Sequence, residues 1–423
     1  MEPARSAARG FFPLDEDLGL ESSDLTPHAQ EGLVRLAAWV PFGPAAQLLQ
    51  ALLGVQVSKA SARRCTLQAG EAGLQEWKQQ TEAIERNLPE VPAGEAKQVM
   101  SADGAMVPLV GGVWAEVKTL VLGEVHATEA GEAQVQALSY CSRLTDVPGF
   151  EQATLLETHR RGLEQAAAVA AITDGAEWLQ GFIDYQRADA VRILDFAHAA
   201  AYVNAIGDTV RAAGHRLPPR WLEGVLHRLK HEGPERILVH LSHLCQRCGD
   251  AEVGKKWQYL SQRRAQMQYP IYRAAGWPIG SGIVESANKL VVEARLKGAG
   301  MHWKPENVNP MLILRNAVCN DRWEETWQGR RTQGRQSRQQ KREEQTRVRL
   351  HQAVIRLLRL WLPMRLLRSS PEETTPPSAR SQPSAASPHV SAAPKGRTEA
   401  QKRWGRRPIS PRGIRLQAEF AKH

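Results

Sequence analysis

The sequence predicts an α/β protein in which a mixed sheet is interrupted by a helical block. A small helical segment is expected before it and a basic tail after it. Three observations support this fold class. Apolar and polar residues alternate in the manner of strands between residues 98 and 144. Two short apolar runs, bounded by helical patterns, follow between residues 169 and 194. Apolar residues at three- and four-residue spacing then occupy residues 201–275, which predicts helices there.

The N-terminal part divides into an irregular stretch, residues 1–25, and a helical segment, residues 26–95. Three helices are expected in this segment, separated by a proline and by a glycine, with Ser58 as the N-cap of the third. That third helix carries two adjacent cations, Arg63 and Arg64. A helix, a turn containing glycine and a helix with basic residues form the pattern of a DNA-binding helix-turn-helix. A plain helical bundle explains the same pattern equally well.

The sheet is expected within residues 96–200. The elements follow the order strand, strand, strand, helix, strand, helix, strand, at residues 98–109, 114–125, 134–144, 150–168, 169–172, 177–185 and 191–194. Connections rich in glycine and acids join the first three strands, which favours an antiparallel meander. This order of elements is that of an RNase H-like core, so we expect an RNase H-like mixed sheet.

The helical block, residues 201–275, is expected to be an insertion that precedes the last part of the core, residues 276–327. There a helix resumes after Gly280-Ser281-Gly282 and completes the fold. Residues 328–423 are expected to form a basic tail, helical at first and then too poor in apolar residues to become ordered. The end of the tail is either a loose nucleic-acid tether or a solubilising segment.

Three acids fall where this core would bring them together. Asp103 lies in the first strand, Asp174 follows the fourth strand, and Glu285 lies one turn into the completing helix. Cutting or joining a phosphodiester needs an activated oxygen nucleophile and a stabilised leaving oxygen, which two metal ions about 4 Å apart supply. We therefore expect Asp103 to bridge two Mg²⁺ ions, with Asp174 and Glu285 each completing one site, and Mn²⁺ to substitute. Taken singly, the two aspartates also fit Asp-Gly turns and Glu285 fits a first-turn helix acid.

Asp195 and His198 compete for the same role, because they directly follow the last strand. Asp195 is expected near the same end of the sheet as Asp174 and is the alternative second metal ligand. We prefer Asp174, because its place after the fourth strand matches the expected core, and assign Asp195 and His198 to a supporting shell. A purely structural alternative is a polar brace in which His198 is hydrogen-bonded to a carboxylate.

Two further groups of residues carry chemistry. Arg295, Lys297 and Trp303 follow the completing helix and combine cations with an aromatic ring, so we expect them to contact a phosphate backbone or stack on a base. A charged, solvated helix end is the alternative. Cys245 and Cys248 have the spacing of half a zinc site, but no second pair lies at useful spacing, so buried helical cysteines are the preferred interpretation.

The composition excludes several classes of protein. The net charge of +10 over 423 residues favours a polyanionic partner, because each phosphate contact releases counterions. Five irregularly spaced cysteines do not form a disulfide framework, so a reducing cytoplasm is expected. No apolar run approaches the roughly 20 residues that cross a bilayer, and no signal-peptide core opens the chain, so no membrane partner is expected.

Five segments carry a resemblance to a known family: SADGAMVP (101–108), WAEVKT (114–119), ILDFAH (193–198), PIGSGIVESANK (278–289) and RLKGAGMHW (295–303). Over about residues 11–325 the chain resembles the bacterial insertion-sequence DDE transposases of the Kra-four family, which are distantly related to Mutator-like transposases. The Gly-Ser-Gly-x-x-Glu block is the most specific part of the likeness.

The resemblance implies a DNA transposase that cleaves strands at terminal inverted repeats and joins them to a target. It implies double-stranded DNA as partner, a homo-oligomer on that DNA, and a place at the nucleoid of a bacterial cytoplasm. In the family a Cys- or Asp-x-x-His pair follows the second catalytic aspartate, which favours Asp174 as ligand and Asp195 and His198 as that accessory pair.

One feature departs from the family. Its members often have a cysteine-rich zinc-binding segment ahead of a stretch like residues 12–16, whereas no cysteine precedes Cys65 here. We therefore expect the N-terminus to be truncated. Two alternatives to a working transposase remain: an RNase H-like nuclease without strand transfer, and a degenerate copy that only binds DNA.

Overall fold

The structure is a computed structural model that describes residues 25–129 and 132–361. The chain divides into two units, the first extending to Trp327 and the second beginning at Gln328. Within the described ranges, no helix is both long and apolar enough to cross a membrane. The expectations for residues 1–24 and for the tail after residue 361 lie outside the described residues.

Three helices open the described chain: α2 (Pro27–Trp39), α3 (Phe42–Leu53) and α4 (Lys59–Asn87). Ser58 is the N-cap of α4, as predicted, and its Oγ accepts a hydrogen bond from the amide of Ser61 at 3.0 Å. At 29 residues α4 is far longer than the sequence pattern indicated. Its buried side packs on α14 (Pro305–Cys319), and a Cβ on Gly70 would lie 2.1 Å from the carbonyl oxygen of Pro310. Tertiary packing therefore supports the length of α4.

A mixed sheet of five strands forms the centre of the first unit, in the order β3-β2-β1-β4-β5. The strands are β1 (Lys97–Pro108), β2 (Trp114–Ala127), β3 (Ala133–Arg143), β4 (Ala168–Thr173) and β5 (Val191–Leu194). β2 pairs antiparallel with β1 and with β3, whereas β4 pairs parallel with β1 and with β5. The predicted α/β class, the mixed sheet and the antiparallel meander are confirmed.

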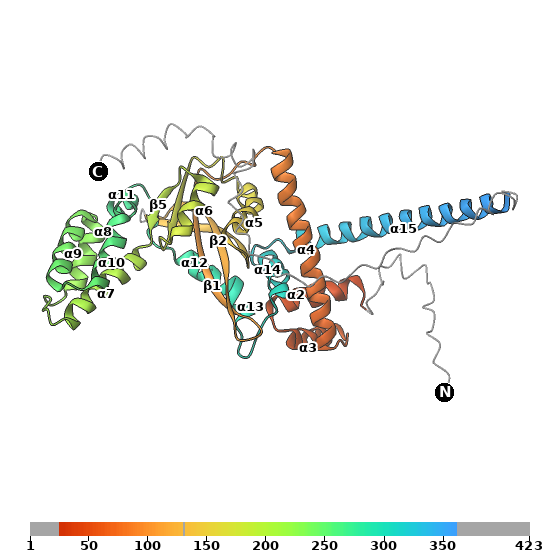
Figure 1. Ribbon diagram of the computed structural model, residues 1–423, viewed down its shortest axis with the longest axis horizontal. Helices are drawn as coiled ribbons and strands as arrows, with labels where there is room; N and C mark the ends of the chain where they lie inside the picture. Colours follow the sequence, from red (N-terminus) through yellow and green to blue (C-terminus); the bar gives the residue numbers. More distant parts are fainter. Residues whose placement is uncertain (1–24, 130–131, 362–423) are drawn as a thin grey trace, which may run out of the picture. The chain divides into compact units, whose positions relative to one another are not determined.

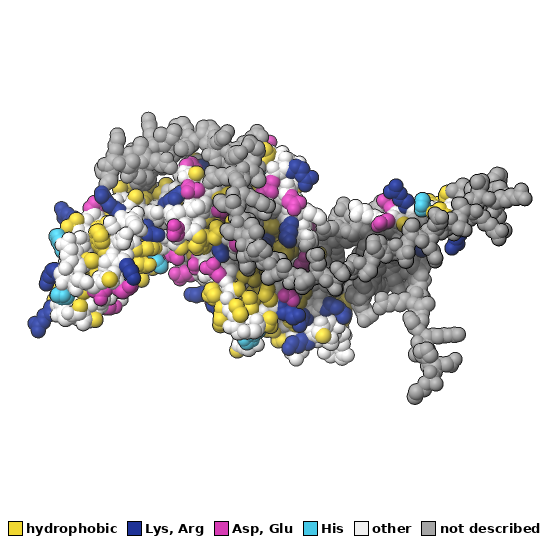
Figure 2. Space-filling model, viewed as in Figure 1, with side chains coloured by type: hydrophobic (Ala, Val, Ile, Leu, Met, Phe, Trp, Pro, Cys, Tyr) yellow, Lys and Arg dark blue, Asp and Glu magenta, His cyan; other side chains and the backbone are white. Residues whose placement is uncertain are grey.

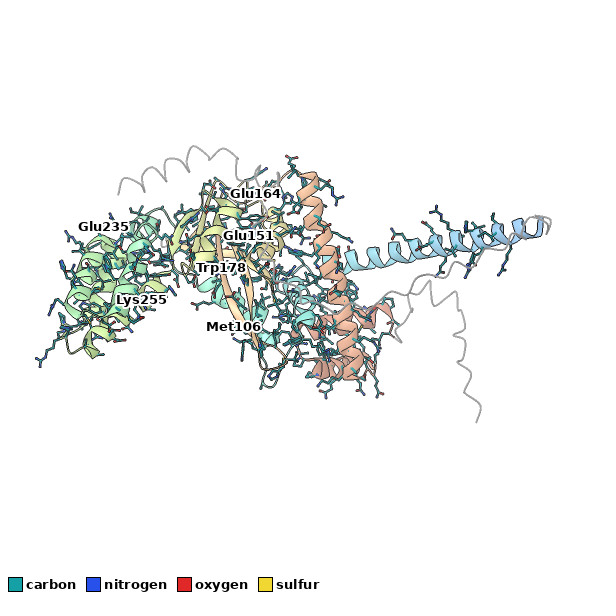
Figure 3. The ribbon with its side chains drawn as sticks, viewed as in Figure 1. Met106, Glu151, Glu164, Trp178, Glu235 and Lys255 are labelled. Atoms are coloured by element: carbon teal, nitrogen blue, oxygen red, sulfur yellow. The ribbon has the colours of Figure 1, made fainter. Side chains whose placement is uncertain are left out.

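Helices cover both faces of this sheet (Figure 1). α5 (Val147–Arg160) and α6 (Glu177–Arg187) pack on the face that carries Ala102 and Leu120, and Trp178 lies against this face (Figure 3). α12 (Gly282–Ala287), the π-helix η2 (Asn288–Glu293) and α14 pack on the face that carries Ala105 and Val107. Because side chains alternate along a strand, Asp103 belongs to the face of α12 and η2.

The helix expected at residues 150–168 is shorter than predicted. α5 ends at Arg160, and Gly162 follows with a φ of 60°. The next residues turn so that the carbonyls of Leu163, Glu164 and Ala166 accept hydrogen bonds from the guanidinium of Arg187. Gly162, in the left-handed conformation, ends the helix. Arg187 donates the hydrogen bonds that the amides of a longer helix would have donated to these carbonyls.

The helical block lies at one end of the sheet (Figure 1). It consists of α7 (Phe196–Ala212), α8 (Trp221–Glu232), α9 (Glu235–Cys248), α10 (Ala251–Gln262), the 3₁₀ turn η1 (Arg264–Met267) and α11 (Tyr269–Ala274). Its core includes Ile172 and Ile193 from β4 and β5, so the block is packed onto the strand ends. The third helix of the block, expected at residues 257–269, instead begins after Asp250, whose Oδ1 accepts from the amide of Glu252 at 2.7 Å.

After the block the chain returns to the sheet through α12, η2 and α13 (Ala294–Leu296), then α14 and α15 (Trp323–Trp361). α2–α4 share a core with this return segment, to which Leu314, Ala317, Trp323 and Trp327 contribute. The helical pattern expected after residue 328 is present as far as Trp361.

Candidate functional site

Asp103, Asp174 and Asp195 lie at the same level of three neighbouring strands. The last pair between β1 and β4 is Met100 with Ala171, so Asp103 and Asp174 each follow three residues later. The last pair between β4 and β5 is Thr173 with Leu194, so Asp174 and Asp195 are the next residues on each strand. The parallel register therefore brings all three acids to one level, directly after β4 and β5 and in the middle of β1.

Asp103 is half-buried at the point where β1 separates from β4. Its Oδ2 accepts a hydrogen bond from Nδ2 of Asn288 in η2 at 3.0 Å. Burial raises the pKa of Asp103; the amide of Gly104 opposes this effect, and the negative charges of Asp174, Glu116 and Glu285 add to it. Several acids therefore act on one half-buried carboxylate, and a divalent cation would relieve the repulsion.

Asp174 lies in a tight turn. Its Oδ1 accepts from the amide of Ala176 at 2.9 Å, and Gly175 has a φ of 80°. The Asp-Gly turn that was the structural alternative is present, and Asp174 is near enough for its charge to raise the pKa of Asp103. The turn also contacts Tyr259 and Arg263, two residues of the helical block that the sequence pattern did not single out.

Glu285 enters from α12, with its residue exposed. It precedes Asn288 by one helical turn, and Asn288 contacts Asp103, so the two side chains approach the strand ends from the same helical segment. Sequence reasoning missed Asn288, although its spacing from Glu285 was a usable signal. Figure 2 shows acidic side chains gathered beside α12, between the helical block and the sheet.

Asp195 has a different environment, because only 5% of its surface is exposed. Its Oδ1 accepts from the amides of Ala197 and Ser281, each at 3.2 Å, so it caps α7 and fixes the turn that leads into α12. Asp195 therefore binds backbone amides of two elements, and its assignment to the supporting shell of a metal site stays a prediction. His198 instead lies against Tyr202 and Tyr259, with ring centroids 5.2 and 6.1 Å away. Within the described residues no hydrogen bond joins His198 to a carboxylate, so the polar brace is not formed.

The side chains at this end of the sheet fit a magnesium or manganese ion by their chemistry. Asp103, Asp174 and Glu285 supply carboxylate oxygens, which these hard cations prefer. Oδ1 of buried Asn288 has no hydrogen-bond partner in the described part of the chain, and it adds an amide oxygen. In that same part, no three His, Cys, Asp or Glu side chains already form a cluster tight enough to hold a metal ion.

Some of the predicted DNA-contacting residues are exposed in the structure, and others are buried. Arg63 and Arg64 are exposed on α4, and Lys297 is exposed and paired with Glu293 at 2.6 Å. Arg295 and Trp303 are only 1% and 6% exposed, so their assignment as DNA contacts is wrong.

The burial of Arg295 and Trp303 has a clear cause. Nε of Arg295 donates to the carbonyl of Ala37 at 2.9 Å, and its guanidinium lies over the rings of Phe42 and Trp303. Nε1 of Trp303 donates to the carbonyl of Leu296 at 3.1 Å. Both side chains thus join the N-terminal helices to the return segment, and neither can reach a phosphate or a base.

The two cysteines of the half-site, Cys245 and Cys248, are half-buried free thiols on α9, in line with the helical interpretation. Comparison of the chain with models of protein families and with curated proteins finds no match to either. The functional conclusion therefore depends on the residues and geometry described above. Asp103 in the middle of β1 and Asp174 directly after β4 supply carboxylates of the kind that hard cations prefer.

Proposed function

We propose that the protein is a DNA transposase of the DDE type, with Asp103, Asp174 and Glu285 as its catalytic acids. The observation that carries this proposal is that these acids come from the middle of β1, the end of β4 and the helix α12, and that the charges of Asp174 and Glu285 both act on Asp103. The raised pKa of Asp103 supports it, because Asp174 and Glu285 are near enough to contribute to the shift. Asn288 supports it further, because its hydrogen bond joins the Glu285 helix to Asp103.

The sheet supports the same class of enzyme. Three antiparallel strands followed by two parallel ones, in the order β3-β2-β1-β4-β5, have the arrangement of an RNase H-like core. We assign the sheet to that fold as part of the proposal. The helical block then interrupts the core between β5 and the helix that carries Glu285, as the resemblance to insertion-sequence transposases implies.

In this proposal Asp103, Asp174 and Glu285 would together hold the Mg²⁺ ions. When bound, the ions activate water or a 3′-hydroxyl and stabilise the leaving oxygen of the phosphodiester. Asn288 orients the Asp103 carboxylate through its hydrogen bond. Asp195 holds the start of α12 through the amide of Ser281, and thereby keeps Glu285 close to the strands.

The partner in this proposal is double-stranded DNA, both at the element ends and at the target. Arg63, Arg64 and Lys297 are exposed cations that suit its phosphates, and the net charge of +10 favours the same partner. A homo-oligomer would form on DNA, since two element ends must be processed together. The proposed place of action is the bacterial nucleoid.

The test is a joining assay with DNA ends taken from the inverted repeats that flank the gene. Purified protein, a duplex with a pre-cleaved 3′-hydroxyl end and supercoiled plasmid are mixed with Mg²⁺ or Mn²⁺. We expect end-to-plasmid products, and we expect Asp103→Asn and Glu285→Gln to reduce them by more than about 100-fold. Glu293→Gln is the matched control: it makes the same change on the same helical segment, paired with Lys297, and joining should persist.

The outcomes distinguish the three functions. Cutting without joining would identify a nuclease and overturn the transposase proposal. DNA binding that survives Asp103→Asn, together with an unmutated protein that neither cuts nor joins in either metal, would identify a copy that only binds DNA. Equal joining by the Glu285→Gln and Glu293→Gln variants would remove Glu285 from the site.

A further inference from the structure

Helix α10 of the helical block binds the turn that carries Asp174. The hydroxyl of Tyr259 donates to the carbonyl oxygen of Asp174. Nε and Nη2 of Arg263 donate to the next carbonyl, that of Gly175, at 2.9 and 2.6 Å. Tyr259 and Arg263 are four residues apart and so lie on one side of the helix end. Two consecutive carbonyls of the turn are therefore bound by two neighbouring side chains, which we term the Tyr259–Arg263 pair.

The turn and the pair fit closely. Gly175 has a φ of 80°, and a Cβ at this position would lie 2.7 Å from both Nε of Arg263 and the hydroxyl of Tyr259. Any side chain at position 175 would therefore displace the pair as well as strain the backbone. The contact is thus a close approach of α10 to the backbone, made possible by the glycine.

The pair is itself supported from α7. Tyr202 stacks on Tyr259 with ring centroids 4.2 Å apart, and His198 lies against both rings. The guanidinium of Arg263 lies 3.8 Å from the centroid of the Tyr259 ring. Packing and charge together limit the movement of both donors.

The consequence concerns the direction of the Asp174 carboxylate. Oδ1 of Asp174 accepts a hydrogen bond from the amide of Ala176, so the carboxylate and the backbone of the turn move together as one unit. We propose that Tyr259 and Arg263 are positioning residues that fix this unit and so present Asp174 to Asp103. This inference rests on the proposed function, and it assigns the helical block a part in assembling the site.

A comparison residue lies in the same block. The hydroxyl of Tyr269 donates to the carbonyl of Leu194 at 3.0 Å, next to Asp195 instead of Asp174. Tyr269→Phe therefore removes the same type of bond at a neighbouring strand end. It serves as the matched control for Tyr259→Phe. Any effect of losing a tyrosine bond at a strand end would appear in this variant too, whereas the Asp174 turn keeps its own bonds.

The experiment compares the full chain with Tyr259→Phe, Arg263→Gln and Tyr269→Phe variants. Mn²⁺ binding is measured from the electron paramagnetic resonance signal of free Mn²⁺. Hydrogen–deuterium exchange measures how fast the Ala176 amide exchanges. We expect the first two variants to weaken Mn²⁺ binding by about 10- to 100-fold and to speed exchange at Ala176. In Tyr269→Phe both quantities should stay near those of the unmutated protein. Raised Mn²⁺ should restore joining by Tyr259→Phe, as expected of a positioning role.

Each result decides the inference. Unchanged Mn²⁺ affinity and unchanged Ala176 exchange in both Tyr259→Phe and Arg263→Gln would overturn it. Equal effects in Tyr269→Phe would also overturn it, because loosening would then be general. If the unmutated protein binds no Mn²⁺, the proposed function fails on its own. The pair is then judged by exchange alone, where faster exchange at Ala176 supports positioning and unchanged exchange refutes it.

Discussion

Asp103 is a single residue of the proposed active site whose protonation affects the stability of the fold. Burial is the largest effect and raises the pKa of Asp103 in the folded protein; the Gly104 amide opposes it, and the charges of Asp174, Glu116 and Glu285 add to it. The folded protein therefore binds this proton more tightly than the unfolded chain does. It follows that the ionised carboxylate destabilises the fold at pH values above the raised pKa, and that this penalty is absent below the ordinary pKa of an aspartate.

We therefore expect Asp103→Asn to stabilise the metal-free protein at pH 7 by roughly 0.5–2 kcal/mol while abolishing joining. Near pH 3.5 the two proteins should differ little, because Asp103 is then protonated in both states. Urea unfolding in the presence of a chelator, followed at several pH values, measures the difference. An identical midpoint at pH 7 would contradict the prediction and show that the acids around Asp103 do not destabilise it.

A second residue-scale prediction concerns Gly70, where α4 crosses α14. The position leaves no room for a methyl group, because a Cβ would lie 2.1 Å from the carbonyl oxygen of Pro310. Gly70→Ala should lower the free energy of unfolding by roughly 1–3 kcal/mol, even though alanine favours helices. Gly224→Ala in α8 is the control: nothing lies within 4 Å of its Cβ, so stability should rise by roughly 0.5–1 kcal/mol. Stabilisation by both changes would show that the helices do not cross so closely.

At the scale of the element, the π-helix η2 is the feature that joins the site to the N-terminal helices. In a π-helix the amides bond to carbonyls five residues back. Arg315 of α14 donates to two carbonyls of η2, those of Leu290 and Val291, and also to the carbonyl of Ala38 near the end of α2. One buried guanidinium thus links α2, α14 and the helical segment that carries Asn288.

Arg315→Met should lower the free energy of unfolding by roughly 2–4 kcal/mol, since it removes the hydrogen bonds that the buried guanidinium donates to three carbonyls. Arg236→Met is the matched control, because this side chain is 85% exposed on α9, and its effect should stay within about 0.5 kcal/mol. Urea titration at pH 7 provides both values. Equal stability of the two variants would mean that the carbonyls near Arg315 find other partners.

At the scale of the whole molecule, charge determines the expected behaviour on DNA. The chain carries a net charge of +10, and Arg63 and Arg64 are exposed on α4. If they contact phosphates, replacing both with glutamine should lower the slope of log affinity against log salt by about 2. Fluorescence anisotropy over a range of salt concentrations measures this slope. Arg236→Gln is a control for lost charge, and a slope unchanged in the double variant would exclude α4 from the DNA surface.

The sequence by itself determined the order and approximate positions of the strands, because a two-residue period and short apolar runs are local signals. Strand order also predicted that Asp103 and Asp174 would lie near each other, and the helix after Gly280-Ser281-Gly282 was expected to bring Glu285 close to the sheet. The extent of α4 and the early end of α5 were not predicted, because packing on α14 and the bonds of Arg187 decide them.

Which polar side chains face solvent and which bind backbone depends on how the elements pack. Arg295 was predicted as a DNA contact because it is a cation close to an aromatic residue. It instead donates to the carbonyl of Ala37, 258 residues away in the chain. Tyr259 and Arg263 lie in an ordinary amphipathic helix, and their contact with the Asp174 turn exists only once the helical block packs on the strand ends. The local sequence does not show which carbonyl a charged or hydroxyl side chain will bind, because such carbonyls are supplied by segments that are distant in the chain.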